Sequence, residues 1–174
     1  MLNRIPTAAI PWIVLAASVA TLGGAYFFQY ALGYAPCHLC LQERIPYIFA
    51  IGAALIAGIL AREANLGFAP LIFLGLCALA FAIGAGLSAF HTGVEYKWWP
   101  GPSSCSGGGL VSNSLNDLQT ELHTGMRVPQ CDSAAWSLFG ISLAGFNFAI
   151  SLALFVLSSL PLARFIREAR GERL

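Results

Sequence analysis

Four long runs of hydrophobic residues alternate with polar segments along the 174-residue chain. About 20 helical residues suffice to cross the hydrocarbon core of a bilayer, and each run is long enough to do so. We therefore predict an all-α membrane protein, a single domain over residues 1–174 built as a four-transmembrane-helix bundle. The uncharged part of the second run begins at Ile45, and we extend its helix back past polar residues to Cys37. The predicted helices cover residues about 10–32, 37–61, 70–90 and 136–162.

The composition agrees with this interpretation. Hydrophobic residues make up 57% of the chain and charged residues 10%, whereas a soluble domain usually carries about 25% charged residues. Arg4 before the first run could mark a secretory signal peptide, but that run exceeds the usual 7–15 apolar residues of a signal core. We expect it to be retained as a helix. A net charge of +1 gives no electrostatic case for nucleic acid or an acidic substrate.

The distribution of Lys and Arg predicts the orientation, because cytoplasmic loops are enriched in these residues. With an even number of helices, both termini lie on one side, and we expect that side to be cytoplasmic. The outer loops then cover residues about 33–40 and 91–135. Within the larger loop, Val111 to Leu122 has the pattern of a short amphipathic helix, lying on the membrane or packed on the bundle. The expected cytoplasmic side holds Arg4, Arg62, Arg164, Arg167, Arg170 and Arg173, and the other side holds Arg44, Lys97 and Arg127.

Four of the five cysteines fall in these outer loops as two pairs. Cys37 and Cys40 form the motif CHLC, which we place at the N-terminus of the second helix, where free N–H groups and the macrodipole favour a thiolate. A structural disulfide here would close too small a loop to stabilise much. An all-cysteine zinc site is disfavoured on an oxidising side of a membrane, and haem attachment needs a His where Leu41 stands. The motif therefore indicates redox chemistry.

Cys105 and Cys131 form the second pair, in the large loop. If paired, they close 27 residues, for which the chain-entropy model gives roughly 3.5 kcal/mol. A structural staple and an exchanging disulfide both remain open, although Ser and Gly around Cys105 indicate an accessible, reactive cysteine. Cys77 lies within the third apolar run, and we expect it to be a buried hydrophobe.

Oxidation of dithiols needs an electron acceptor. No G-x-G-x-x-G fingerprint occurs, so a nucleotide cofactor is unsupported, and a lipid-soluble quinone is the obvious alternative. Arg44, one turn after Cys40, can donate a hydrogen bond to a quinone oxygen, although it could simply reach the headgroups by snorkelling. His91 is a second candidate, for hydrogen bonding or proton transfer, or it is a plain interfacial His. We expect Glu43 to pair locally or to face water.

Together these features resemble the DsbB family of bacterial inner-membrane disulfide-bond formation proteins. The resemblance rests on four helices, the first-loop C-x-x-C, a Glu-Arg dipeptide after it, His-Thr at the end of the third helix, and PGPSSC and PQCD in the second outer loop. It implies that Cys105 forms the mixed disulfide with a partner, that Cys131 exchanges with Cys37, and that Cys40 contacts the quinone. Arg44 and His91 would then lie beside the quinone.

The resemblance also implies partners and location. The partner would be a periplasmic DsbA-like thioredoxin-fold protein, and the acceptor ubiquinone or menaquinone, with no metal. The protein would lie in the bacterial inner membrane with its cysteine loops in the periplasm. Two alternatives stay open: a paralogue dedicated to one substrate system, and a non-catalytic scaffold or metal carrier held by two structural disulfides. A vitamin-K-epoxide-reductase-like enzyme shares the four-helix plan, but its C-x-x-C lies late in the bundle.

Overall fold

The computed structural model describes residues 7–62, 68–102 and 131–171. Within them, four helical spans are long and apolar enough to cross a membrane, which confirms the all-α membrane fold. A short 3-10 helix, η2 (Thr7–Ala9), leads into α1 (Ile10–Tyr30). The second span consists of α2 (His38–Gln42) and α3 (Arg44–Leu60), with Glu43 between them. The others are α4 (Ala69–Glu95) and α6 (Leu143–Ala169).

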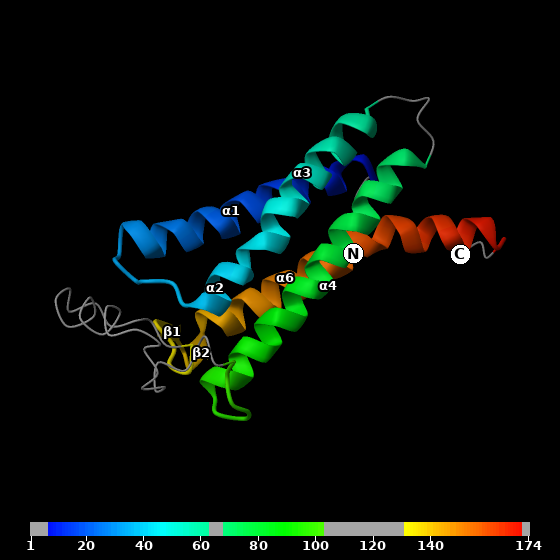
Figure 1. The fold of residues 1–174 in the computed structure, drawn as a ribbon. Helices are drawn as coiled ribbons and strands as arrows, with labels where there is room; N and C mark the ends of the chain where they lie inside the picture. The colour runs from blue at the N-terminus through cyan, green and yellow to red at the C-terminus, as the bar shows by residue number, and fades with distance from the viewer. Residues whose placement is uncertain (1–6, 63–67, 103–130, 172–174) are drawn as a thin grey trace, which may run out of the picture.

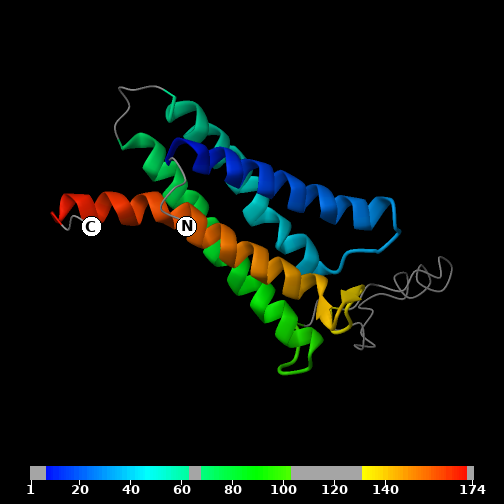
Figure 2. The same cartoon turned by 180° about the vertical axis from the view of Figure 1, so that it is seen from behind.

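The helices form a bundle in which α4 packs against both α3 and α6, and α1 packs against α3. Figures 1 and 2 show the start of α1, the end of α3, the start of α4 and the end of α6 toward one end of the bundle. The opposite end holds α2, the end of α4 and a two-stranded hairpin. We call this opposite end the cysteine end, because Cys37, Cys40 and Cys131 lie there.

An apolar cluster joins α1, α3, α4 and α6 in the body of the bundle. On α3 its members include small residues, and small residues let helices pack closely inside a membrane. Large side chains on the other faces, such as Ile45, Ile59 and Leu79, are more than half exposed, as expected of lipid-facing positions. Cys77 is fully buried in the cluster, as predicted. The buried members are Ile10, Val14, Tyr47, Ala50, Ala53, Ala54, Ala57, Leu74, Cys77, Phe81 and Leu154.

Two helix boundaries at the cysteine end differ from the prediction. The third span continues five residues beyond residue 90, to Glu95, which places His91 within a helix and not at its end. The fourth helix begins at Leu143 and not at 136. Before it, β1 (Ser137–Leu138) and β2 (Ile141–Ser142) pair as an antiparallel hairpin. The region predicted to form an amphipathic helix, 111–122, lies outside the described residues.

The chemistry of the turn explains the later start of α6. Phe139 and Gly140 both have positive φ, at 52° and 81°, a pairing typical of two-residue hairpin turns. Ser142 then caps the helix, because its Oγ accepts a hydrogen bond from the N–H of Gly145 at 3.1 Å. The apolar run covers both the hairpin and the helix, so the run alone does not reveal that α6 begins at Leu143. At its other end α6 continues through Pro161 to Ala169, beyond the predicted residue 162.

Candidate functional site

The CHLC motif lies at the N-terminus of the second span, as predicted. Cys37 is the N-cap of α2, with extended backbone, and its Sγ accepts a hydrogen bond from the N–H of Cys40 at 3.2 Å. The two sulfur atoms lie 2.6 Å apart. Cys37 is only 5% exposed, whereas Cys40 is partly exposed. The pair is therefore in direct contact and sheltered from bulk solvent.

The surroundings of Cys37 favour its thiolate. The hydrogen bond from the Cys40 thiol lowers the pKa of Cys37, and the Cys40 N–H adds to this effect. Burial and the charges of Glu43 and Glu95 act in the opposite direction without reversing it. Because the thiolate is the form that attacks or leaves in disulfide exchange, a lowered pKa raises the fraction of Cys37 in the reactive form.

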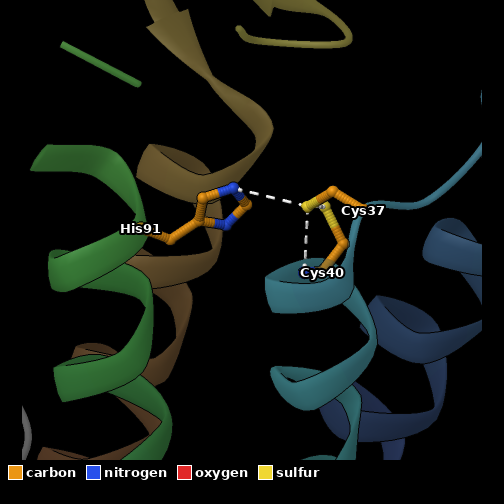
Figure 3. Close-up of side chains that lie close together, drawn as sticks. All are labelled: Cys37, Cys40 and His91. Carbon is orange, nitrogen blue, oxygen red and sulfur yellow. Dashed lines mark hydrogen bonds between the residues drawn. The ribbon is translucent and has the colours of Figure 1, made fainter. Parts of the chain in front are cut away.

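His91 joins this pair from α4 (Figure 3). Its Nε2 lies 3.6 Å from Cys37 Sγ, and its Nδ1 lies 2.8 Å from Glu43 Oε1. The imidazole is 2% exposed. His91 is therefore buried and bridges the cysteine pair and the carboxylate of Glu43.

The expectation for Glu43 was wrong. It is 7% exposed, so it does not face water, and its partners come from α4 and α6, far away in the sequence. The amide of Asn147 donates to Glu43 Oε2 at 2.7 Å and also reaches Ser88 Oγ at 2.7 Å. Tyr47 donates to Asn147 Oδ1 at 2.7 Å. A lone Asn within the fourth apolar run was the available sequence signal for this network, because polar groups in membrane helices are commonly functional.

Glu95 is a second buried carboxylate that sequence reasoning missed. It stands one helical turn after His91, with Oε1 3.8 Å from His91 Nε2. Its side chain is 7% exposed, and no described residue offers its Oε2 a hydrogen bond. The site therefore gathers two thiols, one imidazole and two carboxylates, a donor set that could also hold a metal ion.

A cavity of about 490 Å³ opens beside the cysteine pair. Its volume is within the usual range for small-molecule sites, and apolar side chains of α1 and α6 form much of its wall. Arg44 lines it and donates from Nη1 to Gln29 Oε1 at 2.7 Å, with its guanidinium 4.8 Å above the ring of Tyr26. Arg44 is therefore held by α1 at the cavity wall, which simple snorkelling does not require. Cys40 and His91 line the same cavity.

Cys131 packs close to the cysteine pair. It is disulfide-bonded and fully buried, in a cluster with Cys37, Leu39 and Val94. Just after it, the carboxylate of Asp132 accepts a hydrogen bond from Lys97 Nζ at 2.6 Å. This ion pair holds the Cys131 segment to the end of α4. Cys105 lies outside the described residues.

Comparison with known proteins decides the family. The family model described as "Disulfide bond formation protein DsbB" matches residues 7–160. The chain belongs to the DsbB family. It is therefore a disulfide-bond-forming membrane protein, and the family and the four apolar helices together indicate a multi-pass inner-membrane oxidoreductase.

Relatives extend over nearly the whole chain. It is 30% identical to disulfide bond formation protein B of Verminephrobacter eiseniae, over 99% of this chain and 93% of that protein. It is also 30% identical to the protein of that name from Haemophilus influenzae, over 94% and 91%. An uncharacterized protein of Rickettsia prowazekii is 26% identical over 86% and 84%. No solved structure matches the chain.

Proposed function

We propose that this DsbB-family protein oxidises a periplasmic DsbA-like thioredoxin-fold protein and passes the electrons to a membrane quinone, either ubiquinone or menaquinone. One observation carries the proposal. The Cys37–Cys40 pair packs in one cluster with disulfide-bonded Cys131 and also lines a cavity together with Arg44. The same cysteine pair can thus receive electrons through Cys131 and pass them to an acceptor bound in the cavity.

The proposed relay balances as two successive disulfide exchanges. A thiolate of the partner attacks Cys105 of a Cys105–Cys131 disulfide, and the partner's second thiol then resolves the mixed disulfide. The partner leaves oxidised, and Cys105 and Cys131 become thiols. Cys131 next attacks Cys37 of a Cys37–Cys40 disulfide, and Cys105 resolves that bond. The outer disulfide is restored, and Cys37 and Cys40 hold the two electrons as thiols.

The cavity residues suit the remaining step, in which Cys37 and Cys40 lose two electrons and two protons and close their disulfide. A bound quinone would supply the two-electron, two-proton acceptor. Arg44 could hold its polar end by a charge-assisted hydrogen bond, which can strengthen as negative charge develops. Because the Nδ1 of His91 is held by Glu43, its Nε2 is available to take the proton of the Cys37 thiol. The mostly apolar wall and the few polar groups fit a lipid-soluble ring.

We also propose that the cysteine end faces the periplasm and both termini the cytoplasm. The bias of Lys and Arg supports this orientation, and so does the presence of a disulfide at Cys131, because disulfides persist on the oxidising side.

The direct test uses the purified full chain in detergent with a reduced thioredoxin-fold dithiol protein and ubiquinone. We expect quinone to be consumed in proportion to the substrate disulfide formed. Cys105→Ser should stop oxidation of the protein substrate, whereas Cys77→Ala, the matched control, should leave most of it. Wild-type turnover by Cys105→Ser would remove Cys105 from the relay. Absence of quinone-dependent turnover in the wild type would favour a scaffold with structural disulfides.

A further inference from the structure

Three donor atoms at the site already have spacings close to those of a metal centre. Cys37 Sγ, Cys40 Sγ and His91 Nε2 lie within 4.8 Å of one another (Figure 3). Tetrahedral zinc, with bonds of about 2.3 Å to sulfur and 2.0–2.1 Å to nitrogen, separates S and N ligands by about 3.6 Å and two S ligands by about 3.8 Å. The observed distance from Cys37 Sγ to His91 Nε2 is 3.6 Å. Only the sulfur pair, at 2.6 Å, must open, by about 1.2 Å, which side-chain rotation can supply.

The imidazole is oriented as a metal ligand would be. Its Nδ1 bonds to Glu43 Oε1 at 2.8 Å, which directs the Nε2 lone pair toward the cysteines. A histidine that ligates a metal commonly donates its other ring nitrogen to a carboxylate, which fixes the ring and strengthens its basicity. Asn147 in turn bonds the second oxygen of Glu43 at 2.7 Å. The His91 imidazole is therefore held in place by Glu43, which Asn147 holds in turn.

Glu95 is the carboxylate that could complete the coordination. It lies outside the group of three donors and would have to move toward the two sulfur atoms to bind the same ion. Its side chain is 93% buried. Ser142 is a hydrogen-bond partner of this carboxyl group, but within the described residues Oε2 has no hydrogen-bond partner. An unsatisfied oxygen on a buried carboxylate is costly, and a cation beside it would remove that cost. Its Oε1 already lies 3.8 Å from His91 Nε2. Two thiolates and this carboxylate would place three negative charges around one divalent cation.

We propose that the reduced protein binds one thiophilic divalent cation of the zinc type through Cys37, Cys40, His91 and Glu95, and that the bound cation withholds the dithiol from the electron acceptor. Binding releases the two thiol protons to solvent and moves no electrons. Closing the Cys37–Cys40 disulfide removes two of the four ligands, so the site exists only in the reduced state. The inhibitory consequence rests on the proposed function, whereas the binding itself does not.

Co²⁺ provides the test, because its visible absorption reports tetrahedral geometry and its near-ultraviolet charge transfer reports thiolate ligation. The full chain is reduced in detergent, freed of reductant without air and titrated with Co²⁺. We expect one tetrahedral Co²⁺ per reduced chain, displaced by Zn²⁺, and none in the chain with its disulfides formed. Glu95→Gln should weaken binding at least tenfold. Glu43→Gln, which removes no ligand but disturbs the bonds of Glu43 to His91 and Asn147, should weaken it by about 10- to 100-fold. Cys77→Ala should bind as the wild type does.

Several results would overturn the inference. These are octahedral Co²⁺ without thiolate charge transfer, equal binding by the oxidised chain, loss of binding in Cys77→Ala, or unchanged affinity in Glu95→Gln. A separate arm measures quinone-dependent closure of the Cys37–Cys40 disulfide, in chelator and then with Zn²⁺. Zn²⁺ should slow this closure, and chelator should restore it; an unchanged rate contradicts the inhibitory role. If quinone does not close the Cys37–Cys40 disulfide even in chelator, the proposed electron transfer is wrong, and the Co²⁺ result still stands.

Discussion

Two cysteines in this bundle are almost equally buried, but their sulfur atoms lie in very different surroundings. Cys77 is fully buried and Cys37 is 5% exposed. The thiol of Cys77 sits in the apolar cluster, and its described contact is a weak one to the carbonyl of Ala50 at 3.7 Å. Cys37 instead has a helix N-terminal N–H, a second thiol and an imidazole around its sulfur. Burial protects both thiols, but only the neighbours of Cys37 can stabilise a thiolate.

The same contrast separates the two regions around these cysteines. The apolar cluster is held by close packing of small and aliphatic side chains. The cysteine end buries Glu43, Glu95 and His91, although burying polar or charged groups costs free energy unless they are paired. Such groups inside a membrane protein commonly mark function. The cysteine end thus concentrates buried polar and ionisable groups, whereas the apolar cluster is held by packing.

The largest difference in activity should separate two single variants, one that lacks the Cys37 thiol and one that lacks the Cys77 thiol. Cys37→Ser should reduce quinone-linked turnover to the assay background, because serine can form no disulfide. Cys77→Ala should keep most turnover and lower stability by about 1 kcal/mol, the cost of a methyl-sized cavity. Steady-state quinone reduction and thermal unfolding in detergent measure the two quantities. Similar turnover in both variants would erase the distinction between the two thiols.

A large effect on stability should follow from breaking the buried polar network. Glu43→Ala leaves the His91 Nδ1–H and the Asn147 amide without their carboxylate partner. Each buried donor left unsatisfied costs about 1–3 kcal/mol. Glu168→Ala, at an exposed position near the end of α6, is the matched control and should change stability little. Equal unfolding temperatures for the two variants would show that the Glu43 network contributes nothing to the fold.

An intermediate effect should appear at the cavity. Arg44→Ala removes one charge-assisted hydrogen bond, worth about 1.5–3 kcal/mol, and should raise the Michaelis constant for quinone by roughly 10- to 150-fold. Arg44→Lys should recover part of this, because it keeps the charge but loses the planar fork. Arg62→Ala is a matched control, since Arg62 also stacks on an aromatic ring, that of Trp12, at 4.7 Å, but does not line the cavity. An unchanged constant in Arg44→Ala would leave Arg44 outside the quinone site.

The smallest effect should come from the exposed ion pair beside Cys131. The hydrogen bond from Lys97 lowers the pKa of Asp132, so the pair is formed at neutral pH. Its contribution is lost only as the pH falls through that lowered pKa. Because both side chains are well exposed, solvent screens the pair, and Asp132→Asn should cost no more than about 1 kcal/mol at pH 7. Urea unfolding at pH 7 measures it, and a much larger loss would mean that Asp132 also supports the buried Cys131 cluster.

Local patterns predicted much of this molecule. Apolar runs indicated the four spans, and the CHLC motif after Pro36 indicated a cysteine pair at a helix N-terminus. Contacts between distant segments could not be foreseen in the same way. Glu43 and Asn147 are 104 positions apart, and they meet because α3, which follows Glu43, and α6 both pack against α4. The hairpin was missed because its apolar residues Leu138, Phe139 and Ile141 continue the hydrophobic run into α6.

The central claim is that the Cys37–Cys40 pair delivers electrons to a quinone in the adjacent cavity. The most direct measurement mixes the fully reduced Cys105→Ser chain with excess ubiquinone, without air or metal ions, and maps disulfides by mass spectrometry after acid quenching. That variant cannot form the Cys105–Cys131 disulfide, so any disulfide exchange with that pair is removed and the Cys37–Cys40 pair is tested by itself. We predict one quinol per chain together with a Cys37–Cys40 disulfide. Unreacted quinone, or quinol formed while both cysteines remain thiols, would contradict the account.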